Sequence, residues 1–186
     1  MPDLSAFPIV ARWPARHPDR IQLYSLNTPN GVKVSIMLEE TGLAYEPHLV
    51  DITNGENQWP EFLALNPNGR IPAIIDPAGP GDRPLALFES GAILLYLADK
   101  TGRFVPADEA QRWQAIQWVF FQMASIGPMF GQLGYFNKFA GKAIADKRPL
   151  ERYVAESKRM LGVLDIRHEG RRWIMGDEST IAEIAA

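Results

Sequence analysis

The segment IQLYSLNTPNGVKVSIMLEETG, residues 21–42, joins a short β-type run, a turn and a helix-type run in one continuous stretch. Residues 21–25 are predicted to form a strand, and residues 27–31 contain the Asn, Pro and Gly typical of turns. A helix is expected over 32–41, with Gly42 as its end. The segment therefore predicts the first half of a β-α-β unit.

The elements that follow complete an α/β layer. The helix is expected to bury one side that carries Val32, Ile36 and Met37. A second strand is expected at 47–51, and the remaining elements are a helix over 57–65, strands over 71–75 and 85–88, and a helix over 91–100. A β-α-β unit pairs its strands in parallel through a right-handed crossover, whereas the later hairpin adds an antiparallel strand. The order βαβαββα therefore indicates an α/β domain.

From residue 108 onward the pattern becomes helical throughout. One helix is expected to bury a stripe at spacings of three and four residues, formed by Trp113, Ile116, Phe120 and Met123. The pair Gly127-Pro128 should kink or break this helix. A further helix is expected over 150–168, with Tyr153, Met160 and Leu164 inward. These features predict an N-terminal arm (1–19), an α/β domain (20–102) and an all-α domain (108–186).

The last residues match the start of another helix. Thr180 and Glu183 have the spacing of a capping box, yet the sequence ends at Ala186. A helix start followed by so few residues leads us to expect that the all-α domain is incomplete at its C-terminal end.

Composition excludes several classes of function. The 186 residues carry a formal net charge of −3, which gives no general attraction for nucleic acid or an anionic membrane. No cysteine is present, so a protein-borne thiol, a disulfide and a thiolate metal site are excluded. The three histidines have no ligand-like spacing, and no metal is expected. The first residues lack the apolar core of a signal peptide, which favours a cytoplasmic location.

Two pairs of residues could recognise a peptide-like ligand. Pro72 can be interpreted as an ordinary trans proline at the start of a strand. If the Ile71–Pro72 bond were cis, the backbone N–H and C=O of Ile71 would be turned toward an edge, where they could pair with an extended ligand. Ser90 can simply cap the helix that follows. Alternatively, the free N–H groups of that helix could bind a carboxylate while Glu89 binds an ammonium, a combination that suits an amino-acid head group.

Three further residues have both a structural and a functional interpretation. Thr28 and Asn30 flank Pro29 and could form a turn and a helix cap, or they could direct polar groups at a bound thiolate. Arg152 could be one of the solvated charges common on helices. The residues alone leave these alternatives open.

Taken together, these segments resemble the glutathione transferase superfamily. The resemblance rests on residues 23–40, 61–74 and 87–102 (LYSLNTPNGVKVSIMLEE, EFLALNPNGRIPAI and LFESGAILLYLADKTG). Residues 117–132 and 152–165 (QWVFFQMASIGPMFGQ and RYVAESKRMLGVLD) are similar to the nu class, bacterial enzymes that reduce disulfides with glutathione. The resemblance implies a thioredoxin-like domain followed by an all-helical domain, and a homodimer.

The resemblance also implies roles for individual residues. Pro72 would be cis, and the Ile71 backbone would pair with the cysteinyl part of glutathione. Glu89 and Ser90 would bind its γ-glutamyl head group, and Arg152 would reach it from the helical domain. These roles would make glutathione a co-substrate that supplies the missing thiol.

The resemblance further implies two residues near the glutathione sulfur and one residue beside the glutathione backbone. Thr28 and Asn30 would act at the sulfur in place of a tyrosine, serine or cysteine. Asn57 occupies a slot where the class has glutamine, with Gln58 next to it. Small disulfides, or electrophiles in a side activity, would be the second substrates. The alternative is a non-catalytic, glutathione-binding member of the superfamily.

Overall fold

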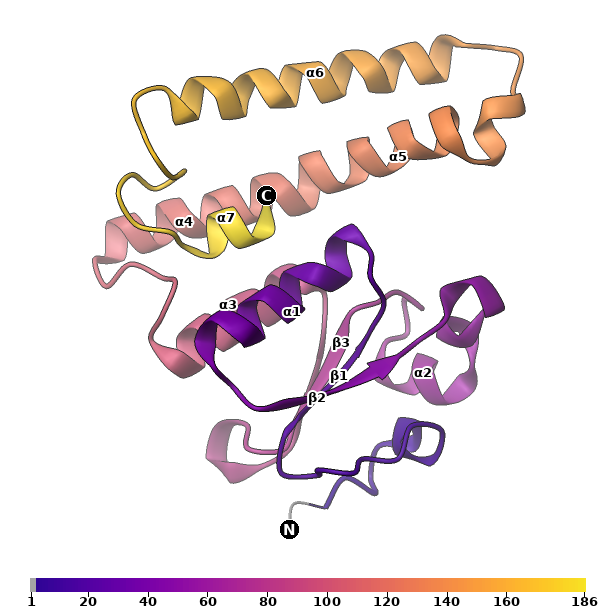
Figure 1. The fold of residues 1–186 in the computed structure, drawn as a ribbon, viewed down its shortest axis with the longest axis vertical. Helices are drawn as coiled ribbons and strands as arrows, with labels where there is room; N and C mark the ends of the chain where they lie inside the picture. Colours follow the sequence, from indigo (N-terminus) through magenta and orange to yellow (C-terminus); the bar gives the residue numbers. More distant parts are fainter. Residues whose placement is uncertain (1–2) are drawn as a thin grey trace. The chain divides into compact units, whose positions relative to one another are not determined.

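The computed structural model describes residues 3–186, which fold as an α/β unit followed by a helical unit (Figure 1). The two compact units are Met1–Thr101 and Gly102–Ala186. Together they give the expected thioredoxin-like and all-α architecture. No helix within residues 3–186 has both the length and the apolar character needed to cross a membrane.

The first unit contains a four-stranded mixed sheet. Its strands are β1 (Ile21–Ser25), β2 (Tyr45–Leu49), β3 (Ala73–Asp76) and β4 (Leu85–Phe88), in the spatial order β2-β1-β3-β4. β1 and β2 are parallel, whereas β3 is antiparallel to both β1 and β4. The predicted β-α-β unit and the predicted hairpin are therefore both confirmed.

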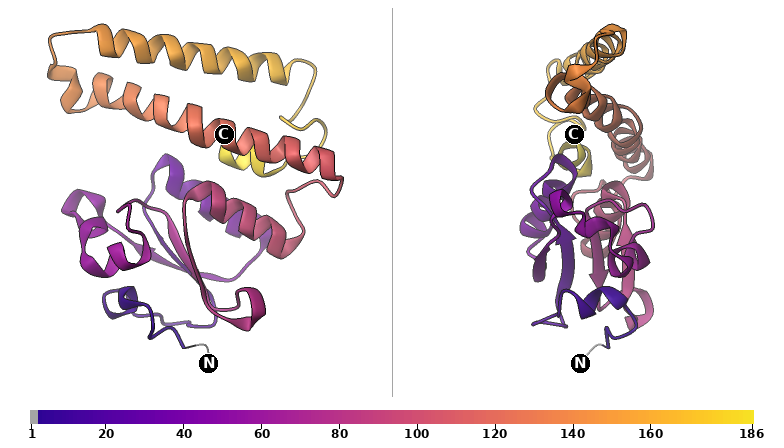
Figure 2. Two further views of the ribbon diagram at one scale, coloured as in Figure 1. Left: turned by 180° about the vertical axis from the view of Figure 1, so that it is seen from behind. Right: turned by 90° about the vertical axis from the view of Figure 1, so that its right-hand side faces the viewer.

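Helices cover both faces of this sheet. α1 (Pro29–Thr41) and α3 (Ser90–Thr101) pack side by side on one face (Figures 1 and 2). On the other face α2 (Pro60–Leu65) packs against a short 3-10 helix of the arm, η1 (Pro8–Ala11). The remaining 3-10 turns are η2 (Ile52–Asn54), η3 (Glu56–Gln58) and η4 (Pro80–Asp82).

Alternation along the strands separates the two layers of the core. Tyr24 and Ala73 belong to a buried cluster with Phe62 of α2. Leu23 and Ile74, one residue away in each strand, are buried too and point to the opposite face. The sheet is therefore covered on both sides, and its functional groups must lie at its ends.

Two expectations for the first half were wrong in detail. α1 begins at Pro29 instead of Val32, because Thr28 caps it and proline suits the first helical position. Ile36 is 45% exposed, whereas Val34 and Leu38 are fully buried. Apolar residues occur on several sides of α1, so its packing against α3 decides which side is buried.

The N-terminal arm is part of the first unit. Residues 8–11 of the arm form one 3-10 turn that buries Ile9 completely. The carboxylate of Glu46 on β2 accepts hydrogen bonds from the backbone N–H groups of Arg16 and His17, at 3.0 and 2.7 Å. These bonds hold the arm against the edge strand.

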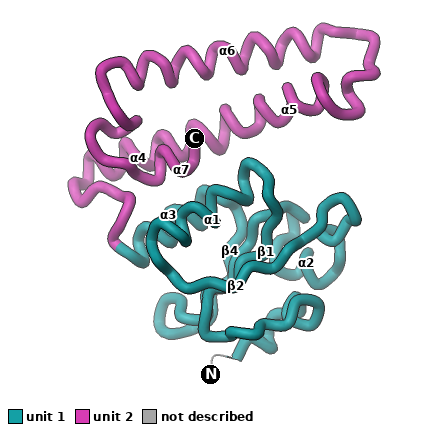
Figure 3. Tube along the Cα trace, viewed as in Figure 1, with its two compact units in different colours: residues 1–101 teal, residues 102–186 magenta. Residues whose placement is uncertain are grey.

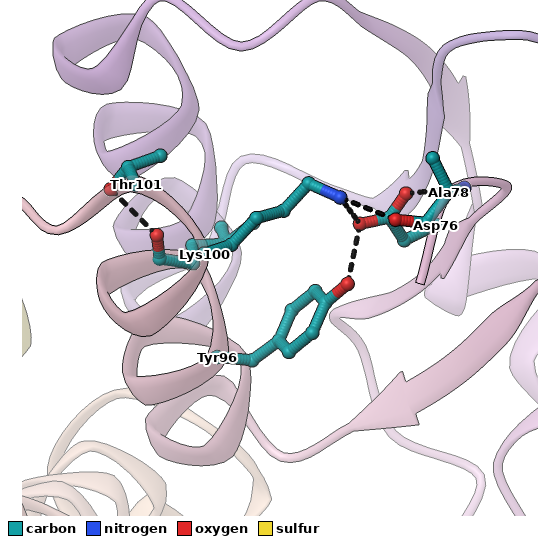
Figure 4. Close-up of polar contacts among 6 residues, drawn as sticks. Asp76, Ala78, Tyr96, Lys100 and Thr101 are labelled. Carbon is teal, nitrogen blue, oxygen red and sulfur yellow. Dashed lines mark hydrogen bonds and ion pairs between the residues drawn. The ribbon is translucent and has the colours of Figure 1, made fainter. Parts of the chain in front are cut away.

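An ion pair between a buried carboxylate and an exposed lysine joins the end of the sheet to α3 (Figure 4). Asp76, at the end of β3, is almost fully buried and binds Lys100 Nζ at 2.8 Å. Tyr96 donates its hydroxyl to the same carboxylate oxygen at 2.6 Å, and burial, followed by this hydrogen bond to Asp76, raises the pKa of Tyr96. Lys100 also donates to the carbonyl of Ala78. We interpret this cluster as structural, because each of its charged groups already has a partner.

The second unit is built from helices (Figure 3). They are α4 (Glu109–Phe121), a π-helical turn (Gln122–Ile126), α5 (Gly127–Lys138), the 3-10 helix η6 (Ala140–Ala143), α6 (Arg148–His168) and α7 (Ile181–Ala185). α5 and α6 lie side by side and antiparallel (Figure 1). The prediction that Gly127-Pro128 kinks or breaks this helix is met in part: regular α-helix ends at Phe121 and resumes at Gly127, but the π turn between them keeps the backbone helical.

The predicted core stripe of α4 was also wrong. Trp113 and Phe120 are each 62% exposed. The buried positions are instead Ala115, Val119 and Ile126, which have a helical spacing of their own. Large apolar residues occur around most of this helix, so periodicity alone does not identify the buried face.

The predicted capping box is confirmed at the start of α7. The Thr180 side chain accepts a hydrogen bond from the N–H of Ala182 at 3.1 Å. The Glu183 carboxylate accepts from the Thr180 N–H at 2.6 Å and also binds the N–H of Ile174. Ile181 is fully buried, and α7 packs against α4.

Candidate functional site

One row of paired residues crosses three neighbouring strands near an end of the sheet. Tyr24 of β1 pairs with Ala73 of β3, which pairs with Phe88 of β4. β1 and β4 leave the sheet at this end, whereas β3 enters it there. The segments just outside the row are therefore close together, and two strand spacings of about 4.8 Å separate the first from the last.

The first of these segments is the start of α1. Thr28 Oγ1 accepts a hydrogen bond from the N–H of Gly31 at 3.2 Å, so the interpretation of Thr28 as a helix cap is confirmed. Asn30 is exposed in the first turn. The early N–H groups of a helix lack internal partners and give this end a partial positive charge.

A third group at the start of α1 was missed by the sequence analysis. Lys33 is only 5% exposed, and its Nζ donates a hydrogen bond to Asn30 Oδ1 at 2.9 Å. Burial lowers the pKa of Lys33 to about 8. The available sequence signal was its position three residues after Asn30, since such pairs are neighbours on a helix.

The second segment is the peptide that enters β3. The Ile71–Pro72 bond is cis, as the family resemblance implied. Pairing of β3 begins at Ala73, so Ile71 lies outside the strand pairing. Pro72 is buried and Ile71 is half-buried, and the peptide preceding the proline lies at the end of the sheet where β3 begins.

Side chains of η3 and of the turn hold this peptide in place. Asn57 donates its side-chain amide to the carbonyl of Gly69 at 2.7 Å, and Gln58 donates to the same oxygen at 3.3 Å. Asn66 donates to the carbonyl of Arg70 at 2.6 Å. The Asn57 amide N–H is therefore engaged in bracing the turn.

The third segment joins β4 to α3. Glu89 has a φ of 70°, a left-handed conformation that is uncommon for a residue other than glycine, and its side chain is exposed. Strained backbone of this kind clusters at ligand-binding sites. Ser90 is buried in the first turn of α3, and the carbonyl of Glu89 accepts the N–H of Ile93. An exposed carboxylate therefore stands beside a helix N-terminus.

Other hydroxyl groups near the row are poorly suited to activating a thiol. Tyr24 is fully buried and belongs to the cluster on the α2 side of the sheet. Burial, followed by the charge of Glu46, raises the pKa of the Tyr24 phenol. Ser25 donates to the neighbouring carbonyl of Leu26 at 3.4 Å. Thr28 and Asn30, at the start of α1, are the residues that the family resemblance implies for the sulfur.

The sheet end therefore assembles most of the expected residues. It brings together Thr28, Asn30, Ile71, Pro72, Glu89 and Ser90, with Asn57 bracing the adjacent turn. Arg152 is carried separately, as an exposed side chain on α6 of the second unit. Within residues 3–186, no group of three or more His, Cys, Asp or Glu is placed to hold a metal ion.

Such an arrangement can hold an extended peptide that carries an amino-acid head group and a thiol. The unpaired peptide at Ile71 offers backbone hydrogen bonds. Glu89 can bind an ammonium, and the N-terminus of α3 can bind a carboxylate. The N-terminus of α1 can lower the pKa of a thiol placed before it.

Comparison with known proteins gives consistent matches. The family described as glutathione S-transferase, N-terminal domain, matches residues 20–99. Over 167 residues the chain is 46% identical to the disulfide-bond oxidoreductase YfcG of Escherichia coli, covering 89% of this chain and 76% of that protein. It is 41% identical to YghU of the same organism, covering 91% of this chain and 59% of that protein.

Solved structures agree over nearly the whole chain. A glutathione transferase from Burkholderia graminis, with two glutathione molecules bound per subunit, is 69% identical, with a TM-score of 0.98 that covers 100% of this chain and 78% of that one. A glutathione transferase from Pseudomonas putida, with one glutathione disulfide bound per subunit, is 63% identical, with a TM-score of 0.96 and coverage of 98% and 79%. By its sequence, its fold and the structures it matches, this chain belongs to the glutathione S-transferase family.

Proposed function

We propose that this chain binds glutathione along the end of its sheet and uses the bound thiolate to reduce disulfides. The observation that carries the proposal is the row Tyr24–Ala73–Phe88, which aligns the starts of α1 and α3 with the cis peptide. The match to YfcG and YghU favours disulfide reduction over conjugation to carbon electrophiles.

The dimensions of the row suit a tripeptide. Two strand spacings amount to about 10 Å. Three extended residues span about the same distance. The Ile71 backbone would pair with the cysteinyl residue, while Glu89 and Ser90 would bind the γ-glutamyl head group. This placement directs the cysteinyl sulfur toward Thr28 and Asn30.

The sulfur end of the site would favour the thiolate. A helix N-terminus and nearby donors lower a thiol pKa from its ordinary value of about 8.5. Asn30 has an exposed amide that can donate to sulfur, and the Thr28 hydroxyl, although it caps α1, still has a proton to donate. Thiolate is the reactive form in exchange with disulfides.

The reaction would proceed by two balanced exchanges. The bound thiolate attacks one sulfur of the substrate, so that a new S–S bond forms while the substrate S–S bond breaks and its other sulfur leaves as a thiolate that takes a proton. A second glutathione thiolate then attacks the glutathionyl sulfur and releases the second thiol. The substrate gains two electrons, and two glutathione molecules become one glutathione disulfide.

Two residues are proposed at the margins of the site. Asn57 uses its amide N–H to brace Gly69, which leaves its Oδ1 for a glutathione backbone N–H. Arg152 would bind a glutathione carboxylate from the second unit. The proposal includes a homodimer, which the family resemblance implies, and a cytoplasmic location, which the first residues favour because they lack the apolar core of a signal peptide.

Calorimetry with glutathione, combined with turnover of a small mixed disulfide, tests the proposal. We expect binding, and turnover that Asn30→Ala lowers at least about tenfold, consistent with losing one hydrogen bond to a charged group. Asn54→Ala, which removes an exposed amide from η2, is the matched control and should leave turnover unchanged. Binding without turnover would favour the non-catalytic alternative, and an absence of binding would refute the proposal.

A further inference from the structure

Lys33 is a buried charge that the proposed chemistry has not yet used. Its side chain is 5% exposed, and it donates to Asn30 Oδ1 at 2.9 Å. Burying an ammonium is costly unless a partner compensates. A methionine would fill a similar volume without the cost of burying a charge, so packing alone does not account for a lysine at this position. We therefore look for the role of Lys33 in its hydrogen bond to Asn30.

The contact determines which way the Asn30 amide faces. A lysine ammonium has three donors and no acceptor, so it must meet the oxygen of the amide and not the nitrogen. With Oδ1 held by Lys33, the Nδ2 group is directed away from the lysine. Asn30 itself is exposed at the N-terminus of α1, so its N–H donors are available at the open end of the site.

We propose that Lys33 is a positioning residue that holds Asn30 with its amide N–H groups toward the glutathione sulfur. This inference rests on the proposed function and adds a residue to it. A neutral asparagine is otherwise ambiguous, because either end of its amide can face a ligand. The oxygen end would repel a thiolate, whereas the nitrogen end stabilises it.

The charge of Lys33 strengthens the effect. A charged donor on Oδ1 polarises the amide and improves the N–H groups as donors. The burial that lowers the pKa of Lys33 indicates a poorly hydrated environment, in which such interactions are weakly screened.

The pKa of the bound thiol is the decisive measurement. It is obtained by titrating the ultraviolet absorbance of the thiolate in the protein–glutathione complex. We expect Lys33→Met to raise this pKa by about one pH unit. In an assay at a pH below the pKa of the bound thiol, kcat for a mixed disulfide should fall by about five- to tenfold, because less of the thiol is ionised. Affinity for γ-Glu-Ala-Gly, which lacks the thiol, should remain within about twofold. An unchanged thiol pKa in a folded Lys33→Met protein would overturn the inference.

Two substitutions at Asn30 separate positioning from a general structural role. Asn30→Asp keeps an acceptor for Lys33 but removes the N–H donors, so it should raise the thiol pKa at least as much as Lys33→Met does. If Lys33 acts through Asn30, adding Lys33→Met to Asn30→Ala should change kcat by much less than Lys33→Met does alone. Independent, multiplicative losses would contradict the proposed coupling.

Control variants distinguish a specific effect of Lys33 from a general effect of the substitution. Lys158→Met makes the same chemical change at an exposed position on α6 and should leave thiol pKa and kcat unchanged. If Lys33→Met proves unstable in thermal unfolding, Lys33→Gln supplies a donor without a charge and should raise the thiol pKa by a smaller amount; no rise at all would count against the inference. The unmodified protein tests the proposed function separately. If it binds glutathione and turns over the mixed disulfide, and the Lys33 variants behave in the same way, then the inference about Lys33 fails while the proposed function stands.

Discussion

The two units of the molecule differ in how far they bury their aromatic residues: the large apolar residues exposed in the first unit, such as Ile36 and Leu49, are aliphatic. In the first unit, Tyr24, Phe62 and Leu94 are fully buried within the α/β layers. In the second, Trp113 and Phe120 are mostly exposed although they lie on the same helix as the buried Val119. A sheet offers two faces to be covered and α1, α2 and α3 cover both, whereas each helix of the second unit buries only one stripe.

The two units also contribute different parts of the proposed site. The first unit carries its own core and places the cis peptide and two helix starts at one end of the sheet. The second unit contributes Arg152 and presents apolar surface on α4 and α6, where Leu161 and Ile166 are also exposed. Substitutions that compare equivalent residues across the two units are therefore the sharpest tests.

The largest effect is expected from truncating a core aromatic residue. Phe62→Ala should lower the free energy of unfolding by about 3–5 kcal/mol, because it leaves a cavity in a fully buried site. Phe120→Ala should lower it by less than about 0.5 kcal/mol. Denaturant unfolding checks both values. Equal losses would show that the exposed face of α4 is covered in solution.

The next effect compares the ligand contacts proposed for the two units. Glu89→Ala should weaken glutathione binding about 10- to 100-fold, since a hydrogen-bonded charge contributes about 1.5–3 kcal/mol. Arg152→Ala, at an exposed position, should weaken it less than about fivefold. Isothermal titration calorimetry measures both constants, and Glu40→Ala, an exposed carboxylate at the far end of α1, is the control. The reverse order would place the main affinity in the second unit.

A smaller effect is expected from the helix cap of the second unit. Thr180→Ala removes the side chain that accepts the Ala182 N–H, and should cost about 1 kcal/mol of stability. Thr180→Ser keeps the hydroxyl and should retain most of that stability. Thermal unfolding of the two variants provides the comparison. Equal losses in both would assign the effect to the methyl group.

The smallest effect concerns acid sensitivity in the first unit. Burial lowers the pKa of His48 below its ordinary value of 6.5, and the ring stacks on Tyr24. As the pH falls, the unfolded chain therefore takes up this proton first. The contribution of neutral His48 to stability is complete above about pH 6.5 and is lost as the pH falls through the folded-state pKa.

Substitution isolates this contribution. His48→Gln should flatten the loss of unfolding free energy just below pH 6.5, the ordinary value for histidine. His168→Gln, the same substitution at the exposed end of α6, is measured alongside it as the control. Denaturant unfolding at a series of pH values measures both. Should His48→Gln keep the original slope, another group must be responsible for acid sensitivity.

Prediction from sequence succeeded where the governing interactions are local. The capping box at Thr180 and the order of strands and helices in the first unit follow from patterns within a few residues. It failed at Ile36 and at the stripe through Trp113, where several faces of one helix are apolar. It also overlooked Lys33, because a lysine on a helix is ordinarily solvated and no pattern in the neighbouring residues predicts that this one is buried.

The sequence by itself determined the order of the elements, their caps and turns, and the family to which the chain belongs. Those properties depend on neighbouring residues and on a joint pattern of motifs. Only the tertiary structure decided that Ile71, Glu89 and the start of α1 share one end of the sheet, and that Lys33 is buried against Asn30. Strand register and the choice of a buried helix face arise from contacts between residues far apart in the chain, which no local pattern specifies.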